Sequence, residues 1–574
     1  MTVRRRTGLK VVGALLAIAA IGLIAIVPPA ARDTPRLTPE PAGAIVRGAY
    51  HIHSDRSDGS GTVDSIAAAA SRAGLQFIIL TDHGDGTRTP DPPSYRSGVL
   101  TIDAVELNTT GGHYAALGLP AAPYPLAGTP DDVIEDVRRL GGFGIAAHPG
   151  SPRPSLAWQP WNSGFDGLEW INADSEWRDE EWWPLVRTLL TYPVRPRESI
   201  AAMLDRPDGV LLKWDETLPH RRVIALAGAD AHARLGFRAR TDPDDSSLHL
   251  PLPGYESSFR AFSNHVVLDG PFTGDASIDA PRLLDAIRQG RTFTVIDGLA
   301  TPGGLDFSAA SGRHSARVGE DLALDGPVMM RARMAAPPRS TLVLSRNGAR
   351  LTDTQTDLSV DVVAEPGIYR IEVYLPAMAA RPGSRPVPWM LSNPIYVGLD
   401  RNVPRPPAEE VPRSRIPARI AEAKPEFGAG DTSTVNYTNA RAGTLAGETP
   451  AVWTFALSPG TAHGQFSALQ LPITGGLASF DRVRFTVVSD RPRRIWTQLR
   501  GTVGTTERWG RTFYTDEQPR TVDLRFADFQ PIGPNAAAKP PFDKVDSLLF
   551  VVDTLNTFPG TKGSLTISEV AFVK

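Results

Sequence analysis

Apolar and amphipathic stretches alternate along the first 300 residues of the chain. Short apolar runs predict strands at residues 46–52, 76–80, 143–147, 168–171 and 223–229. Apolar side chains that recur every three or four positions predict helices at residues 63–73, 131–140 and 278–289. Strands that alternate with helices predict an α/β fold with a parallel sheet or barrel, which we place at residues 45–300.

The pattern changes after residue 300. Alternating apolar and polar positions, with Asn347-Gly348 as a turn between two such runs, predict hairpins and a small Ig-like β-sandwich over residues 305–400. Six prolines among charged residues at 402–425 predict an extended linker. Further short strands predict a second all-β module at residues 427–574, a jelly roll of the galactose-binding-like kind.

The N-terminus predicts export. Arg4, Arg5, Arg6 and Lys10 precede an uncharged run at residues 11–27. This order of charge and apolarity is typical of a signal peptide or an uncleaved membrane anchor, here residues 1–31, before a linker at 32–44. Both forms fit, because the run is short for a membrane span of about 20 residues and the cleavage site is poor. We expect a periplasmic or extracellular protein, held at the inner membrane if the segment stays uncleaved.

Charge and composition narrow the function. The chain of 574 residues has a net charge of −3 and no basic block beyond its N-terminus, so we expect no nucleic-acid partner. It contains no cysteine, which excludes disulfides and thiolate metal ligands. Any metal must therefore be held by histidine, aspartate and glutamate.

Six of the eleven histidines share one setting, at or just after the C-terminal end of a predicted strand or in the loop that follows: His51, His53, His83, His113, His148 and His232. Four carboxylates share it: Asp58, Asp82, Glu106 and Asp230. The C-terminal ends of strands in an α/β sheet face one mouth, so we expect these side chains to converge there. Residues i and i+2 of a strand point the same way, so His51 and His53 can reach one ion. Mixed imidazole and carboxylate ligands suit Zn²⁺, Mn²⁺ or Fe²⁺.

The ordered motifs resemble those of the PHP (polymerase and histidinol phosphatase) family over residues 45–300. They are His51-Ile52-His53-Ser54, Ser57-Asp58-Gly59, Thr81-Asp82-His83, Glu106, His113, Ala147-His148-Pro149 and Asp230-Ala231-His232. The resemblance implies a distorted (β/α)7 barrel that binds two or three divalent ions. Within the family, the exported branch similar to carbamate and ester hydrolases, with C-terminal β domains, looks closest.

Carried over by position, the resemblance implies three ligand sets. His51, His53, Glu106 and Asp230 would hold the first ion, and Glu106 would bridge to a second completed by His113 and His148. Asp58, His83 and His232 would hold a third. Asp82 would be no ligand, but an acceptor that orients an imidazole.

The chemistry that follows is hydrolysis. Divalent ions about 3.5 to 4 Å apart lower the pKa of a shared water and bind the anionic oxygens of a phosphate. We therefore expect a phosphoesterase acting on a small phosphate ester, with Glu106 and Asp230 at the reacting centre and Arg234, less so Arg56, contacting the phosphate. Two alternatives stay open: a carboxyl-ester or carbamate hydrolase, and a non-catalytic surface protein that binds glycan through its β domains.

Tryptophans form two groups of interest. Six of the eleven lie between residues 158 and 183, where core packing is the simpler interpretation and a cap over the metal mouth is the alternative. In the C-terminal module, Trp453, Trp496 and Trp509 could form a sugar platform, but core packing is again the simpler interpretation.

Overall fold

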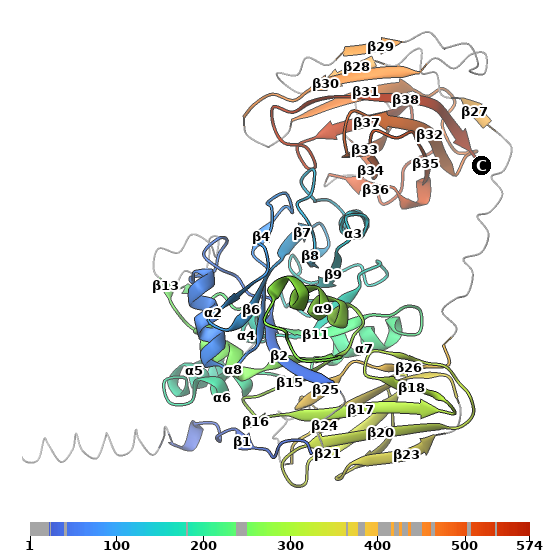
Figure 1. Ribbon diagram of the computed structural model, residues 1–574. Coiled ribbons are helices and arrows are strands. Elements are labelled where there is room, and N and C mark those ends of the chain that lie inside the picture. The colour runs from blue at the N-terminus through green and yellow to red at the C-terminus, as the bar shows by residue number, and fades with distance from the viewer. Residues whose placement is uncertain are drawn as a thin grey trace, which may run out of the picture. The chain divides into compact units, whose positions relative to one another are not determined.

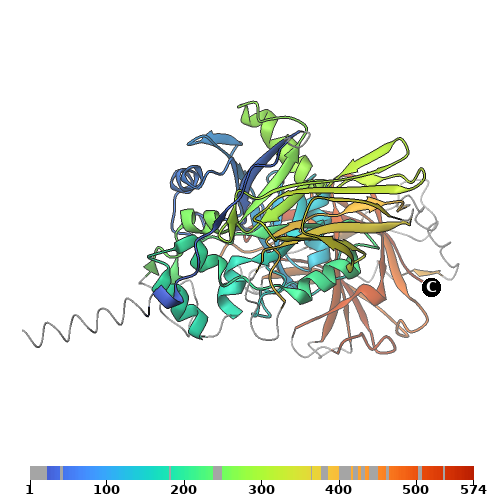
Figure 2. The same cartoon turned by 90° about the horizontal axis from the view of Figure 1, so that it is seen from below.

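The structure of the chain is a computed structural model (Figures 1 and 2). It describes residues 22, 24–38, 43–179, 182–236, 249–362, 365–376, 385–399, 415–417, 424–427, 434–437, 450–460, 465–501, 507–533 and 537–574. Most of the predicted export segment and of the predicted linker at 402–425 lies outside these residues. Within the described part of the chain, no helix has the length and apolarity to cross a membrane.

The chain divides into two compact units. Unit 1 comprises Met1–Gly84, Thr89–Pro120 and Ile134–Arg401. Unit 2 comprises Asp85–Arg88, Ala121–Val133 and Asn402–Lys574. The α/β part and the first β-sandwich therefore belong to one body.

One group of strands in unit 1 runs through the buried core in the order β15-β14-β2-β3-β6-β5. Their bounds are β15 (Thr292–Val295), β14 (Ser263–Leu268), β2 (Ala44–Tyr50), β3 (Phe77–Leu80), β6 (Val99–Asp103) and β5 (Ser94–Arg96). β2, β3 and β6 are parallel, as predicted, whereas β14 is antiparallel to β2. Two helices pack on these strands: α2 (Val63–Arg72), capped by the Thr62 side chain, and α9 (Ala276–Arg288), capped by Asp275.

The second group runs in the order β11-β10-β9-β8-β7-β4. Its members are β11 (Ile224–Gly228), β10 (Gly167–Asn172), β9 (Phe143–Ala146), β8 (Gly112–Leu117), β7 (Val105–Thr109) and β4 (His83–Gly84). A parallel bridge between Ile52 and Ala231 links the two groups. Helices between the strands are α3 (Pro130–Arg139), α4 (Ala173–Asp179), α5 (Trp182–Thr191), α6 (Pro196–Ala201), α7 (Asp208–Thr217) and α8 (Tyr255–Ala261).

The prediction of a parallel sheet is wrong at β8, which is antiparallel to both β7 and β9. Only two residues separate β7 from β8, and so short a connection can close a hairpin but cannot cross over to a parallel strand. At the turn, Gly112 has a φ of 121°, and a Cβ there would lie 2.9 Å from the Ala157 carbonyl oxygen. Glycine is therefore required.

The sandwich shares a sheet with the α/β part (Figures 1 and 2), because β25 (Met390–Ser392) pairs with β15. The Asn393 side chain adds hydrogen bonds to both backbone polar groups of Ala225. The predicted hairpin is present as β21 (Thr341–Arg346) and β22 (Ala349–Thr354), with positive φ at both turn residues. The other strands are β17 (Gly304–Ser311), β18 (His314–Arg317), β19 (Asp321–Leu322), β20 (Val328–Ala335), β23 (Leu358–Val362), β24 (Gly367–Tyr374) and β26 (Ile395–Val397).

Unit 2 contains two sheets around one apolar core. One has β29 (Thr434–Tyr437), β30 (Ala451–Ala456), β38 (Lys562–Val573), β32 (Arg482–Ser489), β35 (Arg520–Arg525) and β27 (Arg415–Pro417); the other has β28 (Lys424–Phe427), β31 (Phe466–Pro472), β37 (Ser547–Asp553), β33 (Arg493–Arg500), β34 (Arg508–Thr515) and β36 (Gln530–Ile532). Trp453 and Trp509 are fully buried in the core, so they form no sugar platform. Trp496, half-buried, packs on a small separate cluster.

Residues 121–133 belong to unit 2 although they lie far from its strands in sequence. The buried Arg494 of β33 donates to the buried carboxylate of Asp132 at 3.0 Å. Asn556 donates to the carbonyl oxygens of Pro125 and Ala127. Residues 121–133 therefore depend on the strands at 427–574, since removing those strands would leave the Asp132 carboxylate without its guanidinium.

We expect Arg494→Met to lower the free energy of unfolding of unit 2 by about 3 kcal/mol, because it leaves a buried carboxylate without its cation. Urea unfolding measures this. Arg484→Met is the matched control: Arg484 pairs with Asp523 at the surface, where a pair contributes less than about 1 kcal/mol. Equal losses in the two variants would contradict the interpretation.

Candidate metal centre

A buried carboxylate, Glu106 on β7, lies at the middle of the histidine cluster. Its Oε2 is 3.2 Å from His51 Nε2, 3.3 Å from His53 Nε2 and 3.4 Å from His83 Nδ1. Its Oε1 is 2.9 Å from His113 Nδ1 and 3.0 Å from His148 Nε2. The two oxygens thus face different imidazoles, the arrangement that a bridging carboxylate needs.

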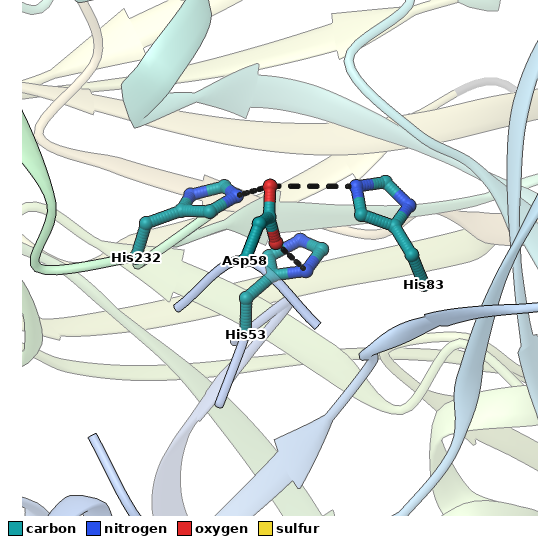
Figure 3. Close-up of side chains that lie close together, drawn as sticks. All are labelled: His53, Asp58, His83 and His232. Carbon is teal, nitrogen blue, oxygen red and sulfur yellow. Dashed lines mark ion pairs between the residues drawn. The ribbon is translucent and has the colours of Figure 1, made fainter. Parts of the chain in front are cut away.

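The nine predicted ligands gather in four overlapping groups whose donor atoms lie within 4.8 Å of one another: His51, His53 and Asp230; His51, Glu106 and His148; His83, Glu106 and His113; His53, Asp58, His83 and His232. The last group is shown in Figure 3, where Asp58 lies between the other three residues. Asp58 Oδ2 is 3.1 Å from His232 Nε2 and 3.7 Å from His83 Nε2. Its Oδ1 is 3.2 Å from His53 Nδ1, so His53 reaches two groups, one with each ring nitrogen.

Two expectations about how the ligands are presented need correction. Strand β2 ends at Tyr50, and His51 has a φ of 64°, so the alternation of an extended strand does not aim His51 and His53 together. Their Nε2 atoms are nevertheless 3.1 Å apart. His113 lies at the beginning of β8 and not after a strand, and it reaches the same mouth because β8 runs antiparallel to its neighbours.

Left-handed backbone recurs among the ligands. His51, His148 and Asp230 have φ values of 64°, 31° and 43°, which non-glycine residues seldom adopt. Hydrogen bonds of His53 N to Ala231 O and of Thr81 N to Ile52 O hold the 51–53 segment between its neighbours. Gly59 is required at the end of the Asp58 loop, because a Cβ there would lie 2.2 Å from the His53 carbonyl oxygen. Such strain is typical of functional sites.

The charge balance of the cluster fits cations. Burial would raise the pKa of the Glu106 carboxyl, but His51, His113 and His148 hold it well below its usual value. The pKa of Asp230 is also held well below its usual value, by His51, His53 and His232 against the effect of burial. Burial would lower the pKa values of His51 and His53, but the carboxylates around them hold both pKa values well above the usual one.

A ring nitrogen of His83 gives separate support for metal binding by the cluster. His83 Nδ1 is buried and forms no hydrogen bond with any described residue. Burial also lowers the pKa of His83, which favours the neutral imidazole that binds metal. The donor set is nitrogen and carboxylate oxygen, as Zn²⁺, Mn²⁺ and Fe²⁺ accept. The residues present therefore fit divalent transition-metal ions.

Sequence reasoning missed Glu169, a buried residue of β10. Glu169 Oε1 hydrogen-bonds His51 Nδ1, which leaves Nε2 of that ring facing Glu106. Its Oε2 accepts from the backbone N–H of His148 and from the Asn172 amide, both at 2.7 Å. A Cβ at Gly228 would lie 2.4 Å from this carboxylate carbon, so the neighbouring strand leaves space for it. One carboxylate therefore positions two ligands.

Asp82 has a different role from the expected one. Its Oδ1 accepts from Ser54 N and from the Ser57 hydroxyl, and its Oδ2 accepts from the Ser54 hydroxyl, each at 2.7 Å. Asp82 therefore holds the loop that carries Asp58, and among the described residues its carboxylate forms no hydrogen bond to an imidazole.

The sequence predicts that two arginines, Arg234 and less so Arg56, contact the substrate, and Arg178 is a third candidate in the structure. Arg56 pairs with Asp91 and Asp103, which favours an ordinary structural role. Arg234 donates to the Asp58 carbonyl oxygen at 3.3 Å, so it lies beside the cluster. Burial would lower the pKa of Arg178 on α4, but Asp174, then Asp230 and Asp58, raise it. Arg178 is thus within electrostatic reach of the ligands, and no sequence motif indicated this residue.

The tryptophans of residues 158–183 do not form one group. Trp158 and Trp170 are buried in the core, as the simpler interpretation expects. Trp182 and Trp183, at the beginning of α5, are exposed. No single cap over the mouth is therefore built from them.

We expect metal uptake to be strongly pH-dependent. The raised pKa values of His51, His53 and His148 mean that incoming ions displace protons, so apparent affinity rises as pH increases through them. In the metal-free protein the protonated histidines stabilise the fold below about pH 6.5, and this contribution is lost as pH rises. Calorimetry in buffers of different ionisation enthalpy should show proton release; affinity that does not change between about pH 6 and 8 would contradict this.

We expect Glu169→Gln to weaken metal binding about 10- to 100-fold. A glutamine amide placed toward His148 N–H sets donor against donor; turned the other way, it forces a proton onto His51 Nε2. Competition with a chelating dye measures the affinity. Asp279→Asn is the control, because Asp279 is a buried carboxylate that accepts from Thr273 N at 2.9 Å and is not among the ligands. A similar loss of affinity in the control would contradict the conclusion that Glu169 positions His51 and His148.

No family model matches the chain. An uncharacterized protein of Methanocaldococcus jannaschii is 30% identical over 113 residues, which are 19% of this chain. The chain spans 65% of the length of that curated relative. Among solved structures, a two-domain protein from Bacteroides vulgatus, described as containing a predicted PHP-like metal-dependent phosphoesterase, matches 63% of this chain and all of its own, with 15% identity and a TM-score of 0.28.

A family 11 carbohydrate-binding module from Clostridium thermocellum, solved with a β-1,3-1,4-linked tetrasaccharide, matches 28% of this chain and 95% of its own. Its identity is 12% and its TM-score 0.23. The solved structures that this chain resembles thus include one described as containing a predicted PHP-like metal-dependent phosphoesterase and one described as a carbohydrate-binding module.

Proposed function

We propose that the protein is a metal-dependent hydrolase of small phosphate esters, with two or three divalent transition-metal ions held by the nine residues of the cluster. The observation that carries the proposal is the set of five imidazoles around the two oxygens of Glu106. When bound, the ions would lower the pKa of an attacking water and neutralise the anionic oxygens of the substrate. No serine or cysteine nucleophile is then required.

The residues of the cluster and its surroundings have separate roles in this proposal. Glu106 shares its charge between two ligand groups, and Asp230, whose Oδ1 lies 3.4 Å from His53 Nε2, supplies a second buried negative charge. Asp58, His83 and His232 form the group nearest Arg234, because Arg234 contacts the Asp58 backbone. Glu169 and Asp82 keep the ligands and the Asp58 loop in place.

The charge beside the cluster favours phosphate over carboxyl esters and carbamates. Arg234 lies beside the Asp58 backbone, and Arg178, which pairs with Asp174, is within electrostatic reach of Asp230 and Asp58. Guanidinium groups bind phosphate oxygens through paired hydrogen bonds. A neutral ester or carbamate would gain little from either cation. We therefore place the phosphate ester first among the candidate substrates.

We also propose that residues 1–31 export the chain and anchor it when uncleaved, on the strength of the basic start and the apolar run at 11–27. A glycan partner is the weaker part of the proposal. Of the three candidate tryptophans, Trp453 and Trp509 are used in the core, which leaves Trp496.

The test is hydrolysis of a panel of phosphomonoesters, phosphodiesters, aryl esters and carbamates with Mn²⁺, Zn²⁺ or Fe²⁺ bound. We expect turnover of a phosphate ester and a fall of about 10³ or more in Glu106→Gln, because the amide has one acceptor oxygen in place of two and no charge to share. Asp82→Asn, another carboxylate-to-amide change in the site, should cost only about 10- to 100-fold. Turnover of carbamates or aryl esters alone would favour the rival hydrolase, and no turnover with metals bound would favour a binding scaffold.

A further inference from the structure

Helix α5 presents an apolar face to solvent. Trp182 is 72% exposed, Trp183 48% and Leu190 52%, and Val186 and Leu189 are also exposed. These positions recur every three or four residues, so they line one side of the helix. Thr188 and Thr191 occupy the buried side. The usual amphipathic order is thus reversed, since apolar side chains face outward and hydroxyl groups inward.

The chain enters unit 1 beside this helix. Arg187 Nε donates to the Ile26 carbonyl oxygen at 2.8 Å, and Arg195 donates to the Pro28 carbonyl oxygen at 2.8 Å. Pro28 is buried and lines one small cavity together with Pro184, Thr188 and Thr191. Figures 1 and 2 both show the short blue segment that precedes β1 (Arg32–Asp33) next to α5 and α6. The apolar run at 11–27 therefore ends against α5.

The described end of that run does not cover the apolar face. Gly22, Ile24 and Ala25 are themselves exposed, with Ile24 at 75%. The described end of the run and the helix thus both present apolar side chains to the surroundings on unit 1. An apolar environment that receives the run would also be in reach of the helix.

We propose that α5 lies on the surface of the lipid bilayer that the N-terminal run enters, with the Trp182 and Trp183 rings at the headgroup level. Tryptophan favours the membrane interface because its ring is apolar and its N–H is polar. A helix with one apolar face binds there by burying that face among the acyl chains. This inference rests on the proposed membrane anchor, not on the hydrolase activity, and it would orient unit 1 on the membrane through two neighbouring contacts.

The absence of cysteine makes the test direct, because one introduced cysteine takes one spin label. The full-length chain carrying Leu190→Cys is reconstituted into vesicles of phosphatidylethanolamine and phosphatidylglycerol, and the label's accessibility to oxygen and to an aqueous nickel chelate is measured. We expect the label to be accessible to oxygen and protected from the chelate. Val186→Cys provides a second probe of the same face.

Leu212→Cys is the matched control. Leu212 is an apolar residue of α7 that is 58% exposed, and α7 lies on the other side of unit 1 in Figure 1. Its label should remain open to the aqueous chelate. If the chain floats with the vesicles but the Leu190→Cys label is accessible to the aqueous chelate, the docking of α5 is wrong. The proposed membrane anchor would then still hold. Failure to float would overturn both, and spin–spin broadening without vesicles would assign the face to a second copy.

Discussion

The structure of unit 1 depends on one electrostatic constraint, the burial of the Glu106 carboxylate among five imidazoles. A carboxylate that is 1% exposed must be compensated by positive charge, because the cost of removing it from water is several kcal/mol. Burial would lower the pKa values of His51 and His53, but the carboxylates around these two imidazoles hold both pKa values well above the usual one, which favours their charged forms. Bound cations would supply positive charge with fixed geometry. The surrounding strands, loops and helices keep the imidazoles directed at the Glu106 carboxylate.

The backbone is adapted to that purpose. His51, His148 and Asp230 adopt left-handed conformations, and each would relax if nothing held it. Glu169 holds two of the three, since it binds the ring of His51 and the backbone of His148. Tyr255 of α8 adds a hydroxyl that donates to the carbonyl oxygen of His53 at 2.8 Å and accepts from Gly61 N. The strain of the ligand residues is thus offset by hydrogen bonds from other elements.

The sequence was informative where chemistry is local. H-x-H, Ser57-Asp58-Gly59 and D-x-H bring ligands close in sequence, and the structure brings all nine predicted ligands together. It was less informative where strand direction matters, since only the two-residue β7–β8 connection reveals why His113 reaches the site. Glu169 could have been noticed in the sequence, because it is a charged residue inside the buried run Gly167–Asn172. The ion pair of Asp132 could not be predicted from the sequence, because its partner Arg494 is 362 residues away.

The most direct test of the account is anomalous X-ray scattering from crystals grown with Mn²⁺. We predict at least two peaks inside the cluster, about 3.5 to 4 Å apart, with one oxygen of Glu106 directed at each. A third peak would lie beside Asp58, His83 and His232. A single peak that leaves either Glu106 oxygen without a metal neighbour, or no peak in the cluster at all, would contradict the proposal that this carboxylate bridges two ions.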